Sequence, residues 1–192
     1  MTIREIINRI YPIPETSLEK MEKCLSKETY PKGYKVLEAG KIETNIFFLE
    51  TGIARVYISI DGKEITFWIG KEGDTIVSLK SYVNNLQGYE TIELMEKSVL
   101  YMLKRKDMYK LFNEDIHISN WGRRFAELEL LRTEEKLIPL LYTTASERYI
   151  KLIEDNPELL QRIPLEHLAS YLGITPVSLS RIRANLVDLK RK

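Results

Sequence analysis

The pattern of hydrophobic and polar positions changes once along the chain, near Lys104. Before this point, seven of the nine glycines separate short runs rich in β-branched and aromatic residues, which is typical of strands joined by turns. After it, apolar residues recur at intervals of three and four, as they do on one face of a helix. The pattern predicts a β-rich N-terminal part followed by a helical C-terminal part.

The β-rich part contains three clear strand candidates, at residues 46–49, 53–60 and 64–69. Asp61-Gly62 lies between two of them and is the strongest short-range signal of a β-hairpin. Turns recur every 8–12 residues or so, which favours a jelly-roll barrel. Before the barrel, Thr16 and Glu19 stand at capping-box spacing, so a short amphipathic helix is expected there.

A long helix is predicted after Lys104, and one side of it is apolar. The residues of this stripe are spaced three, four and three apart and are Ile118, Trp121, Phe125 and Leu128. A stripe of this period favours pairing with a second helix, so these four residues are expected at a dimer interface. The alternative is that the helix lies on its own barrel. Pro139 is expected to kink or end this helix, and a further helix is predicted at residues 146–156.

Residues 163–186 predict two short helices joined by a tight turn. Leu168, Ala169 and Leu172 form the inward face of the first helix, and Gly173 supplies a positive φ at the turn. Thr175 is placed to cap the second helix, with Pro176 at its first helical position. This is the arrangement of a helix-turn-helix, although an ordinary helical hairpin is the alternative.

The second of these helices has short and cationic residues on its outer side, which suits entry into a DNA major groove. Arg181 is the expected base reader because arginine donates two parallel hydrogen bonds to guanine. Hydroxyls and first-turn amides suit phosphate, whereas Arg183 is either a phosphate contact or solvated. The predicted DNA-binding residues are Thr175, Pro176, Val177, Ser178, Ser180, Arg181 and Arg183.

Composition narrows the function classes. The chain has 192 residues, a net charge of +1 and a single cysteine, so Cys24 cannot form an internal disulfide or a four-cysteine cluster. Its apolar runs are shorter than the ~20 residues that span a bilayer, and a cytoplasmic protein without a membrane partner is expected. No histidine cluster, nucleophile elbow or phosphate loop is evident, so neither catalysis nor a metal nor a cofactor is expected.

Taken together, these features resemble the Crp/Fnr superfamily of bacterial transcriptional regulators. The resemblance extends over nearly the whole chain and includes the glycine-punctuated barrel, the Gly73-Asp74 pair, the long helix and the motif LASYLGITPVSLSRIR at residues 168–183. It implies an α+β fold with an N-terminal double-stranded β-helix barrel, flanking helices, a long dimerisation helix and a C-terminal winged helix-turn-helix. Only six residues follow Leu186, so the wing is expected either to be shortened or to be supplied mainly by residues before Pro164.

The resemblance also implies a division into a barrel at residues 1–115, a dimerisation helix and hinge at 116–142, and a DNA-binding domain at 143–192. Its expected partners are a second copy of the chain, double-stranded DNA with two half-sites about 34 Å apart, RNA polymerase and an unknown small-molecule effector.

Relatives that bind cyclic nucleotides use a glutamate and an Arg-Ser pair, and these positions fall near Ser78 and at Gly88-Tyr89. No Lys or Arg occurs from Ser81 to Glu96, and the glutamates there repel a phosphodiester. Tight cyclic AMP binding is therefore not expected, nor is haem, because both histidines lie outside the barrel. A different effector would be bound by a set expected to comprise Phe48, Phe67, Val77, Ser78, Tyr82 and Tyr89, although these aromatics equally suit a filled barrel.

The main alternative to a DNA-binding regulator is a sensor or protein-interaction module that keeps the fold but does not bind DNA. Salt-dependent binding to duplex DNA separates the two, because phosphate contacts release counterions.

Overall fold

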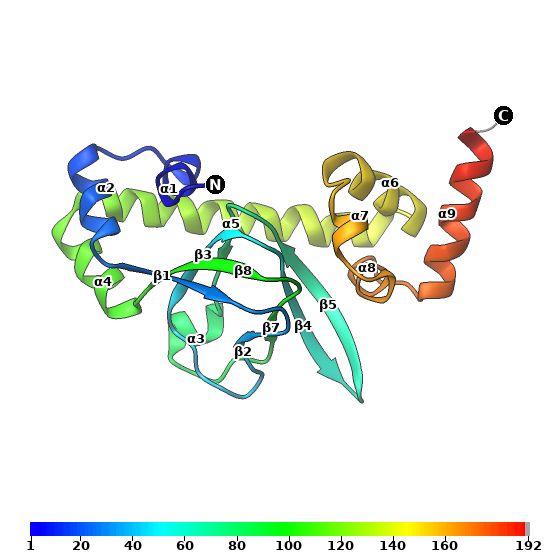
Figure 1. Cartoon of the computed structure of the whole chain (residues 1–192), viewed down its shortest axis with the longest axis horizontal. Coiled ribbons are helices and arrows are strands. Elements are labelled where there is room, and N and C mark those ends of the chain that lie inside the picture. Colours follow the sequence, from blue (N-terminus) through cyan, green and yellow to red (C-terminus); the bar gives the residue numbers. More distant parts are fainter. Residues whose placement is uncertain (191–192) are drawn as a thin grey trace. The chain divides into compact units, whose positions relative to one another are not determined.

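The computed structural model describes residues 1–190, with side chains described up to residue 186. They form two compact units (Figure 1). The barrel unit contains Met1–Val56 and Ile69–Glu134, and the C-terminal unit contains Tyr57–Trp68 and the residues from Glu135 onward. Arg191 and Lys192 lie outside the described residues.

Eight strands form two four-stranded sheets. One sheet has the order β1-β8-β3-β6 and the other β2-β7-β4-β5. The strands are β1 Leu25–Tyr30, β2 Lys35–Leu37, β3 Ile46–Thr51, β4 Ala54–Ile60, β5 Lys63–Gly70, β6 Thr75–Ile76, β7 Thr91–Leu94 and β8 Ser98–Leu103. In the first sheet β8 pairs antiparallel with both β1 and β3. The three strands predicted from the sequence correspond to β3, β4 and β5.

The turn between β4 and β5 has the backbone that its sequence predicts. Asp61 and Gly62 both have positive φ, at 49° and 75°, as a two-residue type I′ turn requires. Glycine adopts this conformation without strain, and aspartate tolerates it better than most residues. The hairpin prediction is confirmed.

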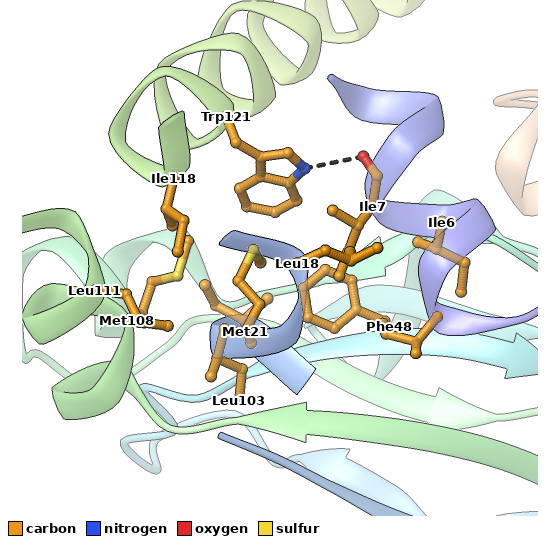
Figure 2. Close-up of a cluster of buried hydrophobic side chains, with 12 residues drawn as sticks. Ile6, Ile7, Leu18, Met21, Phe48, Leu103, Met108, Leu111, Ile118 and Trp121 are labelled. Carbon is orange, nitrogen blue, oxygen red and sulfur yellow. Dashed lines mark hydrogen bonds between the residues drawn. The ribbon is translucent and has the colours of Figure 1, made fainter. Parts of the chain in front are cut away.

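The hydrophobic core of the barrel unit lies between β3, β8 and a layer of helices (Figure 2). The helices are α1 Ile3–Ile10, α2 Glu15–Glu22, α4 Arg105–Glu114 and the first part of α5 Ile116–Tyr142. Trp121 is fully buried among them, and its indole Nε1 donates a hydrogen bond to the carbonyl oxygen of Ile7 at 3.0 Å. The long helix is therefore held to its own barrel.

This packing corrects the expected dimer interface. Ile118 and Trp121 are fully buried in the core of their own chain, so neither can form an interface with a second copy. Phe125 is half-buried and stacks on Trp121 with ring centroids 5.7 Å apart. Leu128 is also half-buried, beside Ile10 and Phe125. The three-four-three spacing marked a buried face correctly, but the partner of that face is the barrel.

Helix caps differ from the expectation at one place. The capping box predicted at Thr16 and Glu19 is wrong, because α2 begins at Glu15 after Pro14 and has no side-chain cap. The boxes that do form are Thr2 with Glu5 at α1 and Thr144 with Glu147 at α6.

The C-terminal unit is helical apart from the tip of the β4-β5 hairpin. Its helices are α6 Ala145–Asp155, α7 Leu159–Arg162, α8 Leu165–Tyr171 and α9 Pro176–Lys190, and the barrel unit adds the short α3 Leu79–Asn84. Helix α5 continues three residues beyond Pro139. No strand follows β8 within residues 104–190, so this part of the chain has no wing. None of the described helices is long and apolar enough to cross a membrane.

Candidate nucleic-acid interface

Helices α8 and α9 meet at a sharp corner made by Gly173, whose φ is +72°. The amide of Ile174 donates to the carbonyl of Ala169 at 3.0 Å and closes the turn. Leu168, Ala169 and Leu179 are fully buried at the contact between the two helices. The small Ala169 side chain lets the helices approach closely, as the sequence predicted.

The start of α9 is capped by Thr175. The Ser178 amide donates to Thr175 Oγ1 at 3.2 Å, and the two hydroxyls are 2.9 Å apart. Pro176 occupies the first helical position, where its missing N–H leaves no hydrogen bond unmade. The N-terminal end of α9, with its first-turn amides, is therefore fixed next to the Thr175 and Ser178 hydroxyl groups.

One side of α9 is open to solvent over at least two turns. Val177 is 61% exposed, so Leu179 rather than Val177 is the inward residue of the first turn. The exposed residues recur at helical spacing and are Val177, Ser180, Arg181, Ala184 and Asn185. Asn185 was not among the predicted site residues, although its place four residues after Arg181 puts it on the same side of the helix. We call this set, with Thr175, Pro176 and Ser178, the exposed face of α9.

Arg183 lies differently from its prediction. It is half-buried, with its guanidinium carbon 5.6 Å from the ring centroid of Tyr149 on α6. It is neither solvated nor directed with the exposed face. We therefore regard Arg183 as a residue that packs α9 on α6 rather than as a DNA contact.

The C-terminal unit holds α8 by two sets of polar contacts. The Arg148 guanidinium donates to the carbonyls of Thr143 at 2.6 Å and Leu172 at 3.0 Å. Ser170 accepts a hydrogen bond from the Thr66 amide at 2.9 Å and donates to the Glu64 carbonyl at 3.0 Å. Since β5 is the edge strand of its sheet, Ser170 pairs with backbone groups on an otherwise open edge.

Lys136 is an unusual residue of this unit. Its ammonium lies 3.1 Å from the ring centroid of Tyr171 and 3.4 Å from the Tyr171 carbonyl oxygen. Burial there, together with the nearby Arg148 guanidinium, lowers the pKa of Lys136 to about 7.

The segment that corresponds to a cyclic-phosphate site is filled by the chain itself. Ser78 is buried and its hydroxyl donates to Ser81 Oγ at 3.2 Å. A methyl group on Gly88 would lie 3.0 Å from Ser78 Oγ and 3.2 Å from Glu90 Oε2. Glu90 is only 5% exposed, and its Oε2 has no hydrogen-bond partner among the described residues. A buried carboxylate at this point is unfavourable for a phosphodiester.

The six predicted effector residues do not line one described cavity. Phe48 is fully buried in the core, with Val77 and Tyr82 packed against the same cluster. Tyr89 is exposed, and Phe67 is an exposed residue of β5 in the C-terminal unit. Phe48 and Tyr82 thus belong to the packed core of the barrel unit.

Helix α5 carries a second apolar stripe, which is exposed. In the C-terminal unit its members recur at intervals of four and are Leu137, Ile138, Leu141 and Tyr142. Leu141 is 79% exposed. We call these residues the α5 stripe.

Comparison with known proteins gives a consistent assignment of the fold. Residues 27–115 match the cyclic nucleotide-binding domain family. The chain is similar to FixK2 from Bradyrhizobium japonicum, with 18% identity, 86% of each chain covered and a TM-score of 0.71. No curated protein sequence matches the chain.

Two further solved structures cover more of this chain. The CooA mutant from Carboxydothermus hydrogenoformans has 20% identity and a TM-score of 0.67, with 98% of this chain and 85% of that chain covered. The Thermus thermophilus Catabolite Activator Protein has 16% identity and a TM-score of 0.59, with coverage of 94% and 87%. The predicted resemblance is thus confirmed at the level of the fold: residues 27–115 match the cyclic nucleotide-binding domain family, and the chain is similar in fold to these three solved structures.

Proposed function

We propose that this protein is a transcriptional regulator that binds a pseudo-palindromic DNA site as a homodimer. The observation that carries the proposal is the exposed face of α9, which begins at a capped N-terminus and presents Arg181 to solvent. Similarity to proteins with the Crp/Fnr fold supports the same function class.

The two ends of this face suit different parts of a duplex. The Thr175 and Ser178 hydroxyls and the first-turn amides can hold a phosphate, because a helix N-terminus offers unpaired N–H groups and a favourable dipole. Arg181 and Asn185 lie one and two turns further along and have the groups that recognise guanine and adenine. Phosphate contacts would fix the register and these side chains would read the bases.

Dimerisation is proposed through the α5 stripe in place of the buried residues Ile118 and Trp121. Four large apolar side chains at the end of one helix form a patch that is costly to leave in water. An identical stripe on a second copy would cover it in a two-fold arrangement. RNA polymerase and a small-molecule effector remain proposed partners.

Cyclic AMP is not the proposed effector. The segment around Ser78 and Gly88 lacks a basic residue from Ser81 to Glu96 and contains the buried Glu90 carboxylate. Isothermal titration of the intact chain is expected to show no binding at micromolar cyclic AMP. Micromolar affinity would contradict this part of the proposal.

Fluorescence anisotropy with labelled genomic fragments tests DNA binding. The expected affinity falls steeply as salt rises, because bound phosphates release counterions. Arg181→Ala is expected to reduce the preference for the best fragment over an unrelated duplex by about 5-fold to 150-fold for each half-site, since each half-site loses one bidentate base contact of roughly 1–3 kcal/mol.

Arg123→Ala is the matched control, since it removes an arginine with a 59% exposed side chain from the barrel unit. It should leave the preference unchanged. Absence of any binding at low salt would contradict the proposal and favour a module that acts on protein partners.

A further inference from the structure

The junction between β8 and α4 contains three consecutive cations that line one depression of the barrel unit. The depression has a volume of about 540 Å³ and is lined by Thr44, Asn45, Lys104, Arg105, Lys106 and Tyr109. The strand register explains how these two segments meet. Because Ile46 pairs with Leu103 in antiparallel β3 and β8, the residues just before Ile46 lie beside those just after Leu103.

Arg105 is held in place by aromatic rings. Its guanidinium carbon lies 5.1 Å from the ring centroid of Tyr109 and 5.9 Å from that of Tyr82. One terminal nitrogen donates to the Val83 carbonyl at 3.4 Å. The Nε atom is buried and has no hydrogen-bond partner among the described residues. A guanidinium held in position in this way can donate charge-assisted hydrogen bonds from its terminal nitrogens to an anion.

The two lysines add charge that no neighbour neutralises. Lys104 and Lys106 are exposed, and neither forms an ion pair within residues 1–186. Lys104 is also the residue at the N-cap position of the ten-residue α4, but its side chain forms no capping hydrogen bond. The first-turn amides of α4 lie at the same end of the helix as the three cations. The carboxylates nearby in sequence are Asp107 in the first turn and Glu43, whose Oε1 accepts from the Asn45 amide at 2.7 Å.

We propose that this depression is a binding site for a small organic phosphate, with phosphate groups on Lys104, Arg105 and Lys106 and the organic body against the Tyr109 ring. Tyr109 is 44% exposed, so part of its side chain is open to solvent beside the cations. The depression is separate from the segment around Ser78 and Gly88 that corresponds to a cyclic-phosphate site. The chain would thus sense or store a phosphorylated ligand at the β8-α4 junction.

Isothermal titration of the full chain at low ionic strength tests this site with two probes, inorganic pyrophosphate and ATP. One binding event per chain is expected for each probe, and ATP should bind more tightly because its base can stack on Tyr109. The double variant K104S/K106S should weaken both probes at least tenfold. Tyr109→Leu should weaken ATP more than pyrophosphate, since the organic body of ATP contacts the ring directly, whereas pyrophosphate is affected only through Arg105, which the ring helps to hold.

The matched control is K32S/K35S, which removes two exposed lysines from the same unit away from the depression. It should bind both probes as the unchanged chain does, and thermal melting should show that all variants remain folded. Equal weakening in the control would mean attraction to overall charge and would overturn the site. The site would also be overturned if the unchanged chain bound neither probe. It would be overturned as well if K104S/K106S bound both probes normally and lost affinity only for duplex DNA.

Discussion

At the scale of single residues, Trp121 ties the long helix to the barrel. Its indole Nε1 donates a hydrogen bond to the Ile7 carbonyl oxygen on α1, and its ring centroid lies 6.1 Å from that of Phe48 on β3. We expect Trp121→Ala to lower the free energy of unfolding by about 3–5 kcal/mol, the usual range for removing a large buried aromatic side chain. Urea titration followed by circular dichroism measures this.

Trp121→Phe keeps most of the ring and provides a milder test if Trp121→Ala does not fold. It removes the hydrogen bond, which is worth about 0.5–1.5 kcal/mol, together with part of the buried volume. Leu79→Ala, at an exposed position of α3, should change stability by less than about 0.5 kcal/mol. A Trp121→Phe chain of unchanged stability that no longer dimerises would show that Trp121 lies at a dimer interface after all.

Lys136 gives the C-terminal unit a specific pH dependence. The pKa of Lys136 is lowered to about 7 in the folded chain, from an ordinary value of 10.5. Between these values the unfolded chain binds more protons at Lys136 than the folded chain does, so this residue makes stability rise with pH. We expect Lys136→Met to remove that rise between pH 7 and 10. Melting temperatures measured across this range test it, and an identical slope in both chains would contradict it.

Residue roles at the helix-turn-helix could be predicted where local geometry decides them. Thr175, Pro176 and Gly173 have the predicted roles, because capping, a fixed φ and a positive φ depend on nearby backbone. Arg183 could not be predicted, since its position depends on Tyr149, 34 residues earlier in the chain. Glu90 was recognised as a negative charge, but its burial follows from the folded barrel.

At the scale of elements, Ser170 connects α8 to the edge strand β5. Its hydroxyl forms both hydrogen bonds to the β5 backbone, at Thr66 and Glu64. Ser170→Ala removes both, and we expect amide exchange at Thr66 to become about 2-fold to 12-fold faster, because the bond that the Thr66 amide itself donates contributes about 0.5–1.5 kcal/mol. Hydrogen exchange followed by mass spectrometry of the 60–70 segment measures this.

Ser180→Ala is the matched control, because Ser180 lies on the exposed face of α9. It should leave exchange in β5 unchanged. Unchanged exchange in Ser170→Ala would show that this contact does not hold the hairpin tip.

The sequence predicted which elements form more reliably than it predicted what they pack against. The hairpin at Asp61-Gly62 and the corner at Gly173 form as expected because each depends on a few adjacent residues. The spacing of Ile118, Trp121 and Phe125 identified a buried helix face. Periodicity does not distinguish a neighbouring sheet from a second chain, so the expected interface was wrong for Ile118 and Trp121.

At the scale of the whole molecule, the proposed dimer depends on the α5 stripe. Leu137→Glu combined with Leu141→Glu places two charges among its apolar residues, and burying them would be unfavourable. We expect the unchanged chain to sediment as a dimer and the double variant as a monomer. Leu79→Glu alters an exposed leucine of α3 and should remain a dimer. A double variant that stays dimeric would place the interface elsewhere.

The general architecture was predictable because glycine spacing and helical periodicity are repeated along the chain. The boundaries of the compact units were harder to predict. The compact units divide at Glu134 inside α5, and the 57–68 hairpin tip groups with the C-terminal helices. Such grouping depends on contacts like that of Ser170 with β5, which no local pattern reveals. The three-part division at residues 115 and 142 remains a prediction.

Selection of binding sites from random duplexes by the intact chain shows whether the exposed face of α9 reads DNA. We expect an enriched palindrome with half-sites centred about one helical turn apart, roughly 10 base pairs. The Arg181→Ala chain should enrich a related palindrome that has lost preference at one position in each half-site. An unenriched pool, or the same preference at every position for both chains, would contradict the claim that the exposed face of α9 reads DNA.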